Sequence, residues 1–483
     1  MTSDSGLICQ ETDYARHIQE VLDALHQMQP PPRLVTSPDA LEAFEREMRQ
    51  RTDRLGSLLV GYHRQQALDS AAWQAEPERL VSHWPPPLKN DGKVRVMSRT
   101  AQGLAVPVRV TYYRRKGQRR AGTRSAGVYA GLVLLGIYDR CPPALASEVS
   151  LLAAMLGSLT EAQDMLAARG VELDTKTVRT IAYRYAARAR LEQQVNNAAL
   201  EDSVAGRRVV ISSDGGRMRL RESKRGPKTT QGRRRYTGAW RDPKVLIVYV
   251  VDAEGKRAAS FAPFIEATRK GPEAVFALLR SSLQRLEITQ ADQVLFIADG
   301  APWIWKRVPV LVQALGLAVE QGQELLDFYH AVQHLGQVAA LRHDWSAKAR
   351  PRWRTHQRRL LLQGQVEQVI AAVRDLCQGR NSKAIRKHRD YFIKNQGRMT
   401  YAQLMAMKLP IGSGAIESTV RRVINLRVKG SGLFWCRASA EAILLLRSYY
   451  NGSFLPILDK GEQFPGVIWI PAASRSHYRI VLY

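Results

Sequence analysis

The sequence predicts an α/β protein in which a segment of β-strands lies between two helical regions along the chain. Three observations predict this class. Apolar residues recur at helical spacing through residues 1–80. Short apolar runs typical of strands follow within residues 207–328. Helical periodicity with little strand signal then returns over residues 341–407.

Composition indicates the kind of partner. The 483 residues carry 72 Lys and Arg against 44 Asp and Glu, a formal net charge of +28 that suits a polyanion such as nucleic acid. An anionic lipid surface would also suit this charge, but no apolar stretch approaches the roughly 18 residues of a membrane span. The four cysteines form no CxxC pair, which disfavours a zinc ribbon or a disulfide framework. We expect a cytoplasmic, nucleoid-associated protein.

A chain of this length exceeds what one hydrophobic core usually organises, so we expect several domains. The predicted segments are an N-terminal helical region of unassigned role at 1–90, a DNA-binding region at 91–200, a catalytic domain at 201–340 and 408–450, a helical insertion at 341–407 and a C-terminal tail at 451–483.

The first two segments have recognisable patterns. The N-terminal helical spacing is broken by Pro30–Pro32, and Val94–Tyr113 is strand-like. Residues Arg109–Arg124 carry seven Lys or Arg and no acid, which fits either a solvated hairpin edge or contact with a DNA backbone.

Residues 159–190 have the pattern of a helix-turn-helix. An amphipathic run is followed by Gly170 at the turn, then by Asp174 or Thr175 as the cap of a second helix that carries Arg179 and Arg184. Two short helices joined at a glycine are also common scaffolding, so DNA docking and simple packing both remain open.

The central segment predicts three successive strands, at Arg207–Ser213, Val245–Val251 and Ala258–Phe264. A helix from about Pro272, a fourth strand at Val294–Ala298 and a fifth at Glu324–Phe328 follow. Three adjacent strands and then alternating helices and strands match the order of a ribonuclease H-like fold.

Three acidic residues occupy corresponding places in this order. Asp214 ends the first strand, Asp299 ends the fourth, and Glu417 lies in a later Arg-rich amphipathic segment. Carboxylates placed at strand ends can together hold two divalent metal ions. An isolated Asp before Gly is more often a turn residue, but the three in this order predict a catalytic site.

Basic residues flank these acids. Arg217–Lys244 contains eleven Lys or Arg against two acids, which fits either a flexible charged loop or a clamp on DNA. A cluster around Trp353 in the helical insertion has the same two interpretations. The DNA-contact candidates are Arg179, Arg184, Arg217, Arg233, Arg234, Arg235, Arg421, Arg422, Arg427 and Lys429.

Four motifs together resemble an ISKra-type DDE insertion-sequence transposase of the Mutator-like group: SSDGGR around Asp214, ADGAPWIW around Asp299, DFYHAVQHL from Asp327, and GSGAIESTVRRVINLRVKGSGLFW around Glu417. The resemblance extends over about residues 94–450. It implies DNA strand cleavage and strand transfer at the ends of a bacterial insertion sequence, and an accessory role for Asp327 and His330, although His330 also fits a structural role at a helix start.

The expected chemistry is in-line phosphoryl transfer with two Mg²⁺ or Mn²⁺ ions, Asp214 bridging both ions and Asp299 and Glu417 each holding one. The expected partners are double-stranded DNA, both element ends and target, and further copies of the chain in a synaptic complex. The alternatives are a sequence-specific repressor, an inactive transposase relic, or a nuclease of the same fold that cuts but never joins.

Overall fold

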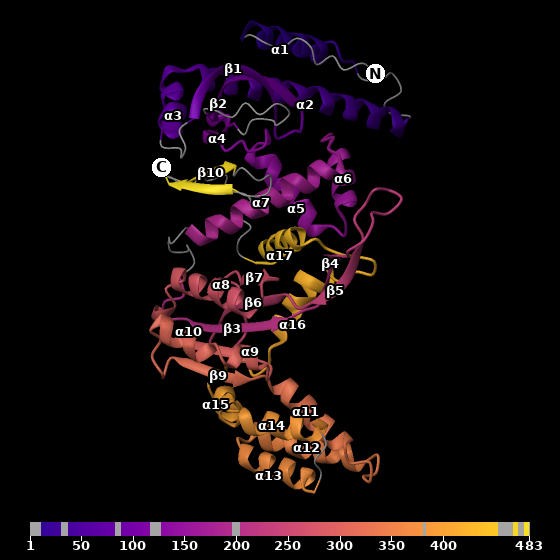
Figure 1. Ribbon diagram of the computed structural model, residues 1–483, viewed down its shortest axis with the longest axis vertical. Coiled ribbons are helices and arrows are strands. Elements are labelled where there is room, and N and C mark those ends of the chain that lie inside the picture. Colours follow the sequence, from indigo (N-terminus) through magenta and orange to yellow (C-terminus); the bar gives the residue numbers. More distant parts are fainter. Residues whose placement is uncertain are drawn as a thin grey trace. The chain divides into compact units, whose positions relative to one another are not determined.

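The computed structural model describes residues 11–29, 37–82, 88–115, 127–195, 203–379, 383–452, 467–471 and 478–482. The chain divides into two compact units, one formed by Met1–Glu192 with Pro456–Tyr483 and the other by Gln193–Leu455 (Figure 1). Helices and a mixed sheet are both present, so the α/β class is confirmed. The sequence motif Pro30–Pro32 and residues 116–124 of the basic stretch lie outside the described residues.

The first unit begins with helices, as predicted, and these pack on a strand pair. Its elements are α1 (Glu11–His26), α2 (Pro38–Asp69), α3 (Ala71–Ser82), β1 (Leu88–Arg99), β2 (Ala105–Arg115), α4 (Ala130–Leu134), α5 (Pro143–Met155), α6 (Leu159–Ala167), α7 (Thr175–Val195), β10 (Val467–Pro471) and β11 (Tyr478–Leu482). Leu68 of α2 packs with Val108 and Val110 of β2 in one apolar cluster. The helical region and the strand pair that follows it therefore share a core.

The predicted helix-turn-helix residues form the consecutive helices α6 and α7. Gly170 in the connection has a φ of 82°, a conformation that glycine adopts without strain. The Asp174 carboxylate accepts a hydrogen bond from the Thr177 amide at 2.7 Å and so caps α7. Arg179 is exposed, whereas Arg184 forms an ion pair with Asp139.

The second unit contains a five-stranded mixed sheet in the order β7-β6-β3-β8-β9. Its strands are β3 (Arg208–Gly215), β6 (Lys244–Val251), β7 (Phe264–Thr268), β8 (Gln293–Ala298) and β9 (Gly322–Leu326). β6 pairs antiparallel with both β3 and β7, while β8 runs parallel to β3 and β9 parallel to β8. The chain thus makes an antiparallel meander and then adds two parallel strands.

Several strand boundaries differ from the sequence prediction, and two of the differences have a clear local cause. The third strand begins at Phe264 instead of Ala258, since the chain first turns and Pro263 has no amide hydrogen to donate to a ladder. The fifth strand ends at Leu326 because Asp327 leaves the sheet to cap the next helix. In both cases the local hydrogen-bonding groups decide where the strand can pair.

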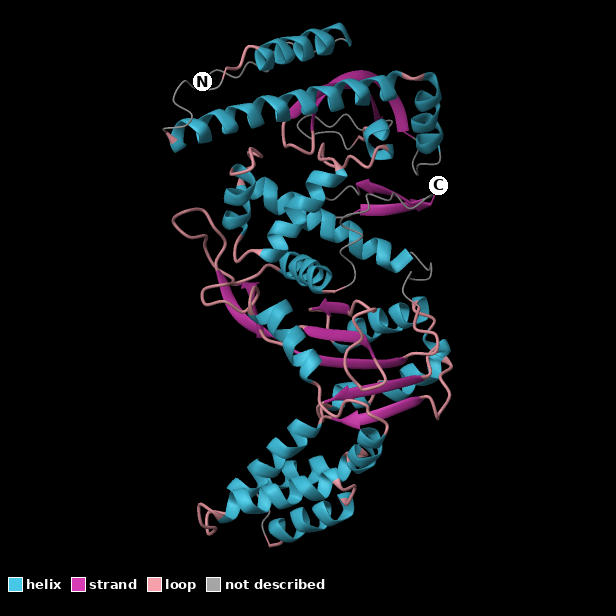
Figure 2. Ribbon diagram, turned by 180° about the vertical axis from the view of Figure 1, so that it is seen from behind, coloured by secondary structure: helices cyan, strands magenta, loops and turns pink. Residues whose placement is uncertain are grey.

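Helices cover the sheet and extend from it. These are α8 (Pro272–Arg285), α9 (Pro302–Trp305), α10 (Val308–Leu315), α11 (Phe328–Ala340), α12 (Ala349–Leu362), α13 (Val366–Cys377), α14 (Lys383–Lys394), α15 (Tyr401–Ala406), α16 (Gly414–Val420) and α17 (Arg437–Asn451). The region predicted as a helical insertion is indeed helical (Figure 2). Val369 and Phe392 of this region belong to the same apolar core as Leu295 and Leu326 of the sheet.

The basic connection between β3 and β6 is an ordered hairpin. β4 (Met218–Ser223) pairs antiparallel with β5 (Tyr236–Arg241). The side chains of Met218 and Leu220 are buried in the core of the unit. The DNA-contact candidates of this segment are exposed: Arg217, Arg233, Arg234 and Arg235.

The segment after Glu417 is not a regular helix. α16 continues into one π-helical turn, η3 (Arg421–Asn425), a feature that is rare and often found at functional sites. Arg421 and Lys429 are exposed, and Arg422 is half-buried. Arg427 is 5% exposed, and its guanidinium lies 5.2 Å from the centroid of the Trp435 ring, a cation–π contact. This burial leaves little of its surface for the predicted contact with DNA, which stays a prediction.

None of the helices in the described ranges combines the length and the apolar composition needed to cross a bilayer.

Candidate functional site

Two of the predicted acidic residues lie at the carboxyl ends of neighbouring parallel strands. Asp214 is near the end of β3, and Asp299 directly follows β8. The Ser212 hydroxyl donates a 2.6 Å hydrogen bond to the Ile297 carbonyl, which joins the two strands just before these acids. Since parallel strands place their carboxyl ends at the same edge of a sheet, the two acids share one edge.

Asp214 is a half-buried carboxylate with an unusual proton affinity. Its pKa is raised to about 6, chiefly by burial; the negative charge of Asp299 also raises it, whereas the Gly215 amide, His330 and Lys244 lower it. The Gly215 amide donates to the Asp214 carboxylate at 2.6 Å. The charges of Asp299 and His330 both change the pKa of Asp214, so the three side chains interact electrostatically.

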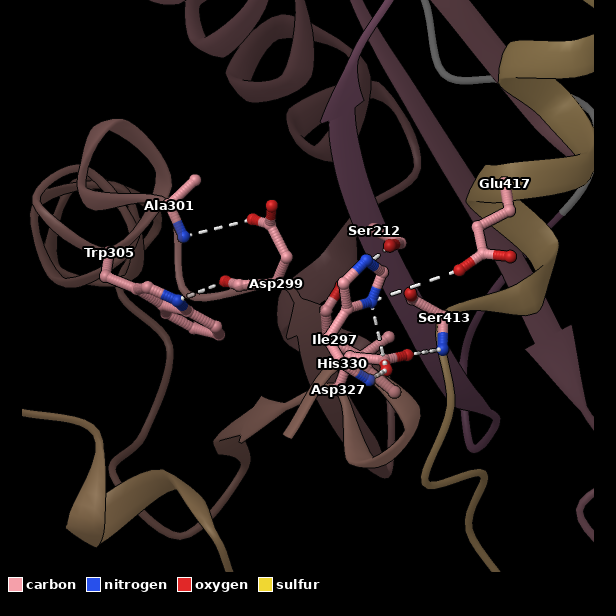
Figure 3. Close-up of polar contacts among 9 residues, drawn as sticks. All are labelled: Ser212, Ile297, Asp299, Ala301, Trp305, Asp327, His330, Ser413 and Glu417. Atoms are coloured by element: carbon pink, nitrogen blue, oxygen red, sulfur yellow. Dashed lines mark hydrogen bonds and ion pairs between the residues drawn. The ribbon is translucent and has the colours of Figure 1, made fainter. Parts of the chain in front are cut away.

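Asp299 is fixed by its own turn. Its carboxylate accepts a hydrogen bond from the Ala301 amide at 3.0 Å, and its carbonyl accepts one from the Trp305 indole at 2.7 Å. Trp305 in turn lies under Arg398, 4.6 Å from the ring centroid. In Figure 3 the Asp299 carboxylate points to the Ala301 amide and not to Glu417.

Asp327 joins three parts of the site. Its side chain is 1% exposed, and its own amide donates to the Ala298 carbonyl at 2.8 Å, next to Asp299. One carboxylate oxygen accepts from the His330 amide at 2.6 Å and caps α11. The other accepts from the Ser413 amide, directly before α16. Burial alone would raise the pKa of Asp327, but the hydrogen bonds from His330 and Ser413 outweigh it and lower the pKa.

His330 links this buried carboxylate to the third predicted acid. Its Nδ1 lies 3.2 Å from Asp327 Oδ1 and 3.9 Å from Glu417 Oε1, and Figure 3 shows the ring between the two. The hydrogen bond to Asp327 raises the pKa of His330, and the charges of Asp299 and Glu417 add to this effect. The Glu417 side chain is 57% exposed, so it is available to a ligand.

The structure therefore gathers all five predicted site residues in one region, but in two groups. His330 contacts both Asp327 and Glu417, whereas Asp214 and Asp299 interact with this group through their charges. Within the described part of the chain, no three His, Cys, Asp or Glu side chains lie close enough together to hold a metal ion. The carboxylates must approach one another further to share a cation.

Two residues that contact the candidate site were not predicted from the sequence. Ser413 contributes only a backbone amide, which leaves no sequence signal. Tyr391 of α14 lies against Gly300, where a Cβ would meet its ring at 2.2 Å. Burial raises the pKa of Tyr391, and the charges of Asp299 and Asp327 raise it further. The Asp-Gly pair after a strand could have indicated that another side chain packs closely against Gly300. It could not have indicated that this side chain is Tyr391.

Tyr391 also stacks on His334, one turn after His330, with ring centroids 3.8 Å apart. Burial and the charge of His388 lower the pKa of His334 to about 4. Because the unfolded chain binds a proton near pH 6.5 and the folded chain near 4, stability is complete above pH 6.5 and falls as the pH drops toward 4.

We expect the protein to lose about 1 kcal/mol of unfolding free energy through His334 between pH 7 and pH 5, after discounting for solvent screening. Urea unfolding of wild type and His334→Gln at the two pH values measures this. Equal pH dependence in the two proteins would contradict it.

Comparison with known proteins adds little. No protein-family model matches the chain, and no curated protein matches it in sequence. Among solved structures, a Drosophila P element transposase strand transfer complex is similar at a TM-score of 0.24 and 10% sequence identity, over 72% of this chain and 82% of that one. A TM-score this low does not establish a shared fold, so the site has to be judged from its own residues.

Proposed function

We propose that the chain is a metal-dependent DNA transposase of the DDE type, with a ribonuclease H-like catalytic unit that cleaves and joins the ends of a bacterial insertion sequence. One observation carries the proposal. Asp214 and Asp299 end adjacent parallel strands, and Asp327 ties the start of the Glu417 helix to the same strand edge. Three acids distant in sequence are thereby brought to one edge of the sheet.

The donor set fits a hard divalent cation such as Mg²⁺ or Mn²⁺. Its members are carboxylates, the ligands these ions prefer. The pKa of Asp214 is raised to about 6 by burial and by the charge of Asp299, and a cation would relieve both effects. Asp214, Asp299 and Glu417 would hold two such ions, which would activate the attacking oxygen and neutralise charge on the departing 3′ oxygen.

The other residues of the site orient these acids. The His330 ring lies within ion-pair distance of both Asp327 and Glu417. When protonated, it would attract the Glu417 carboxylate and so restrain this side chain. Lys244, paired with Gly215 in the sheet, lies over the Trp303 ring at 4.6 Å and supplies positive charge beside Asp214. Lys244 is 7% exposed and its Nζ lies 3.2 Å from Asp242 Oδ2, so it acts on Asp214 through its charge.

Exposed cations supply a path for DNA around the site. Arg421 and Lys429 follow Glu417, and the hairpin β4–β5 carries the exposed residues Arg217 and Arg233. Guanidinium and ammonium groups bind phosphates without reading sequence, so they suit a DNA backbone. Further copies of the chain are expected in a complex that holds two element ends.

The proposal is tested with a duplex that carries the element end and a target duplex, with Mg²⁺ or Mn²⁺, comparing wild type with Asp299→Asn. We expect nicked and joined products from wild type and neither from the variant. Cleavage without joining would indicate a hydrolytic nuclease. Binding without cleavage by the wild type would indicate a repressor or an inactive relic.

Protons and metal ions should compete for Asp214. Because its pKa is raised to about 6, the carboxyl is mostly protonated at pH 5. We expect the Mg²⁺ concentration that gives half-maximal cleavage to rise up to about tenfold per pH unit below pH 6. Mg²⁺ titrations at pH 5 and pH 7 measure this, and an unchanged requirement would contradict it.

A further inference from the structure

One face of the β4–β5 hairpin alternates cations with aromatic rings. Opposite residues of an antiparallel pair share a face, and the register places Arg219 opposite Trp240 and Ser223 opposite Tyr236. Met218 and Leu220 point the other way, into the core. The aromatic face is therefore the outer one.

A third chain segment completes this face. The Trp435 amide donates to the Arg219 carbonyl, and the Arg221 amide donates to the Trp435 carbonyl, both at 2.9 Å. Phe434 consequently lies on the outer face, over Gly238, where an added Cβ would meet its ring at 2.3 Å. Glycine at this position leaves room for the Phe434 ring beside Tyr236 of β5, with ring centroids 5.7 Å apart.

The rings are held by arginines yet remain accessible. The Arg219 guanidinium lies 4.8 Å from the Trp240 ring and 5.1 Å from the Phe434 ring, and Arg221 lies 4.7 Å from the Tyr236 ring. Trp240 is nevertheless 50% exposed and Tyr236 44% exposed. Large exposed rings cost free energy in water, and rings already restrained lose little entropy on binding a ligand.

We propose that this surface, Arg219, Arg221, Tyr236, Phe434 and Trp240, is a stacking platform for unpaired bases of single-stranded DNA. Every base offers a π-face, but in a duplex those faces are covered by neighbouring base pairs, so exposed rings select unpaired strands. The segment Arg217–Lys244 has eleven cations and two acids, which favours a polyanion over a protein partner.

The platform lies close to the predicted chemistry along the chain. Arg219 is five residues after Asp214, a separation of at most about 17 Å. A strand whose phosphate lies at Asp214 can thus place nearby bases on the rings. The inference rests on the proposed function for the presence of such a strand, but base stacking itself requires neither metal nor cleavage.

The test measures how tightly the full chain binds two fluorescein-labelled DNAs of equal length, an oligothymidylate and a duplex. Binding is measured by fluorescence anisotropy in EDTA. Trp240→Ala is expected to weaken single-strand binding about 5- to 150-fold, with duplex binding changed less than about twofold. Trp240→Phe keeps a ring and should retain most of the affinity. Trp240→Leu keeps apolar surface without a ring and should behave like the alanine variant.

A charge control separates stacking from phosphate contact. Arg233→Gln should lower the salt dependence of binding to both DNAs, whereas Trp240→Ala should leave it unchanged. Unchanged single-strand binding by Trp240→Ala, or equal loss on single strand and duplex, would overturn the platform. Failure of cleavage in wild type would refute the proposed function and leave these binding results standing.

Discussion

Glu417→Gln is expected to abolish cleavage and strand transfer, with a loss of about 10³-fold or more. Glutamine preserves the size of the side chain but removes the negative charge that would hold a divalent ion. Since the Glu417 side chain is 57% exposed, its replacement should leave the fold and its stability nearly unchanged. DNA binding measured in EDTA should also remain within about twofold of wild type.

The matched control is Glu320→Gln, which neutralises an exposed carboxylate in the turn before β9. It changes the net charge by the same amount, so it reports any general effect of charge on DNA affinity. We expect wild-type cleavage and joining from it. If Glu417→Gln retained more than a tenth of the wild-type rate, Glu417 would not be a metal-holding residue.

Asp327→Asn is expected to damage both stability and activity. The buried carboxylate accepts hydrogen bonds from the amides of His330 and Ser413 on different oxygens. An asparagine side chain has only one acceptor oxygen, so its NH₂ group would face one of these amides. We expect a loss of about 1–3 kcal/mol in unfolding free energy from the unmatched buried group.

The same substitution should also loosen Glu417. Without the carboxylate, His330 loses the interaction that chiefly raises its pKa, and the chain before α16 loses its tie to the strand edge. We expect strand transfer to fall at least tenfold while DNA affinity in EDTA changes little. Rates compared under conditions in which the variant is fully folded separate this effect from simple unfolding.

Asp252→Asn provides a control of the same chemistry. Asp252 accepts hydrogen bonds from the Glu254 and Lys256 amides, but in an exposed turn. Both amides donate to the same oxygen, which asparagine keeps, and water reaches this turn, so the cost should stay below about 1 kcal/mol. Similar losses of stability and activity in the two variants would show that Asp327 has no special positioning role.

Local patterns in the sequence were sufficient for several features. The apolar runs located β3, β6 and β8, and helical spacing located the helices of 341–407, because side-chain periodicity follows directly from backbone geometry. The placement of Asp214 and Asp299 at strand ends followed in the same way. Glu417 at the start of α16 was anticipated from the amphipathic segment that contains it.

Only the tertiary structure decided which of these residues meet. The contact of Asp327 with Ser413, the stacking of Tyr391 beside Gly300 and the burial of Arg427 under Trp435 each join segments that no local pattern relates. The outer face of β4–β5 likewise depends on Phe434 from another segment. Sequence alone determined which backbone elements form, since these depend on near neighbours; packing between distant segments determined which charges are buried, paired or exposed.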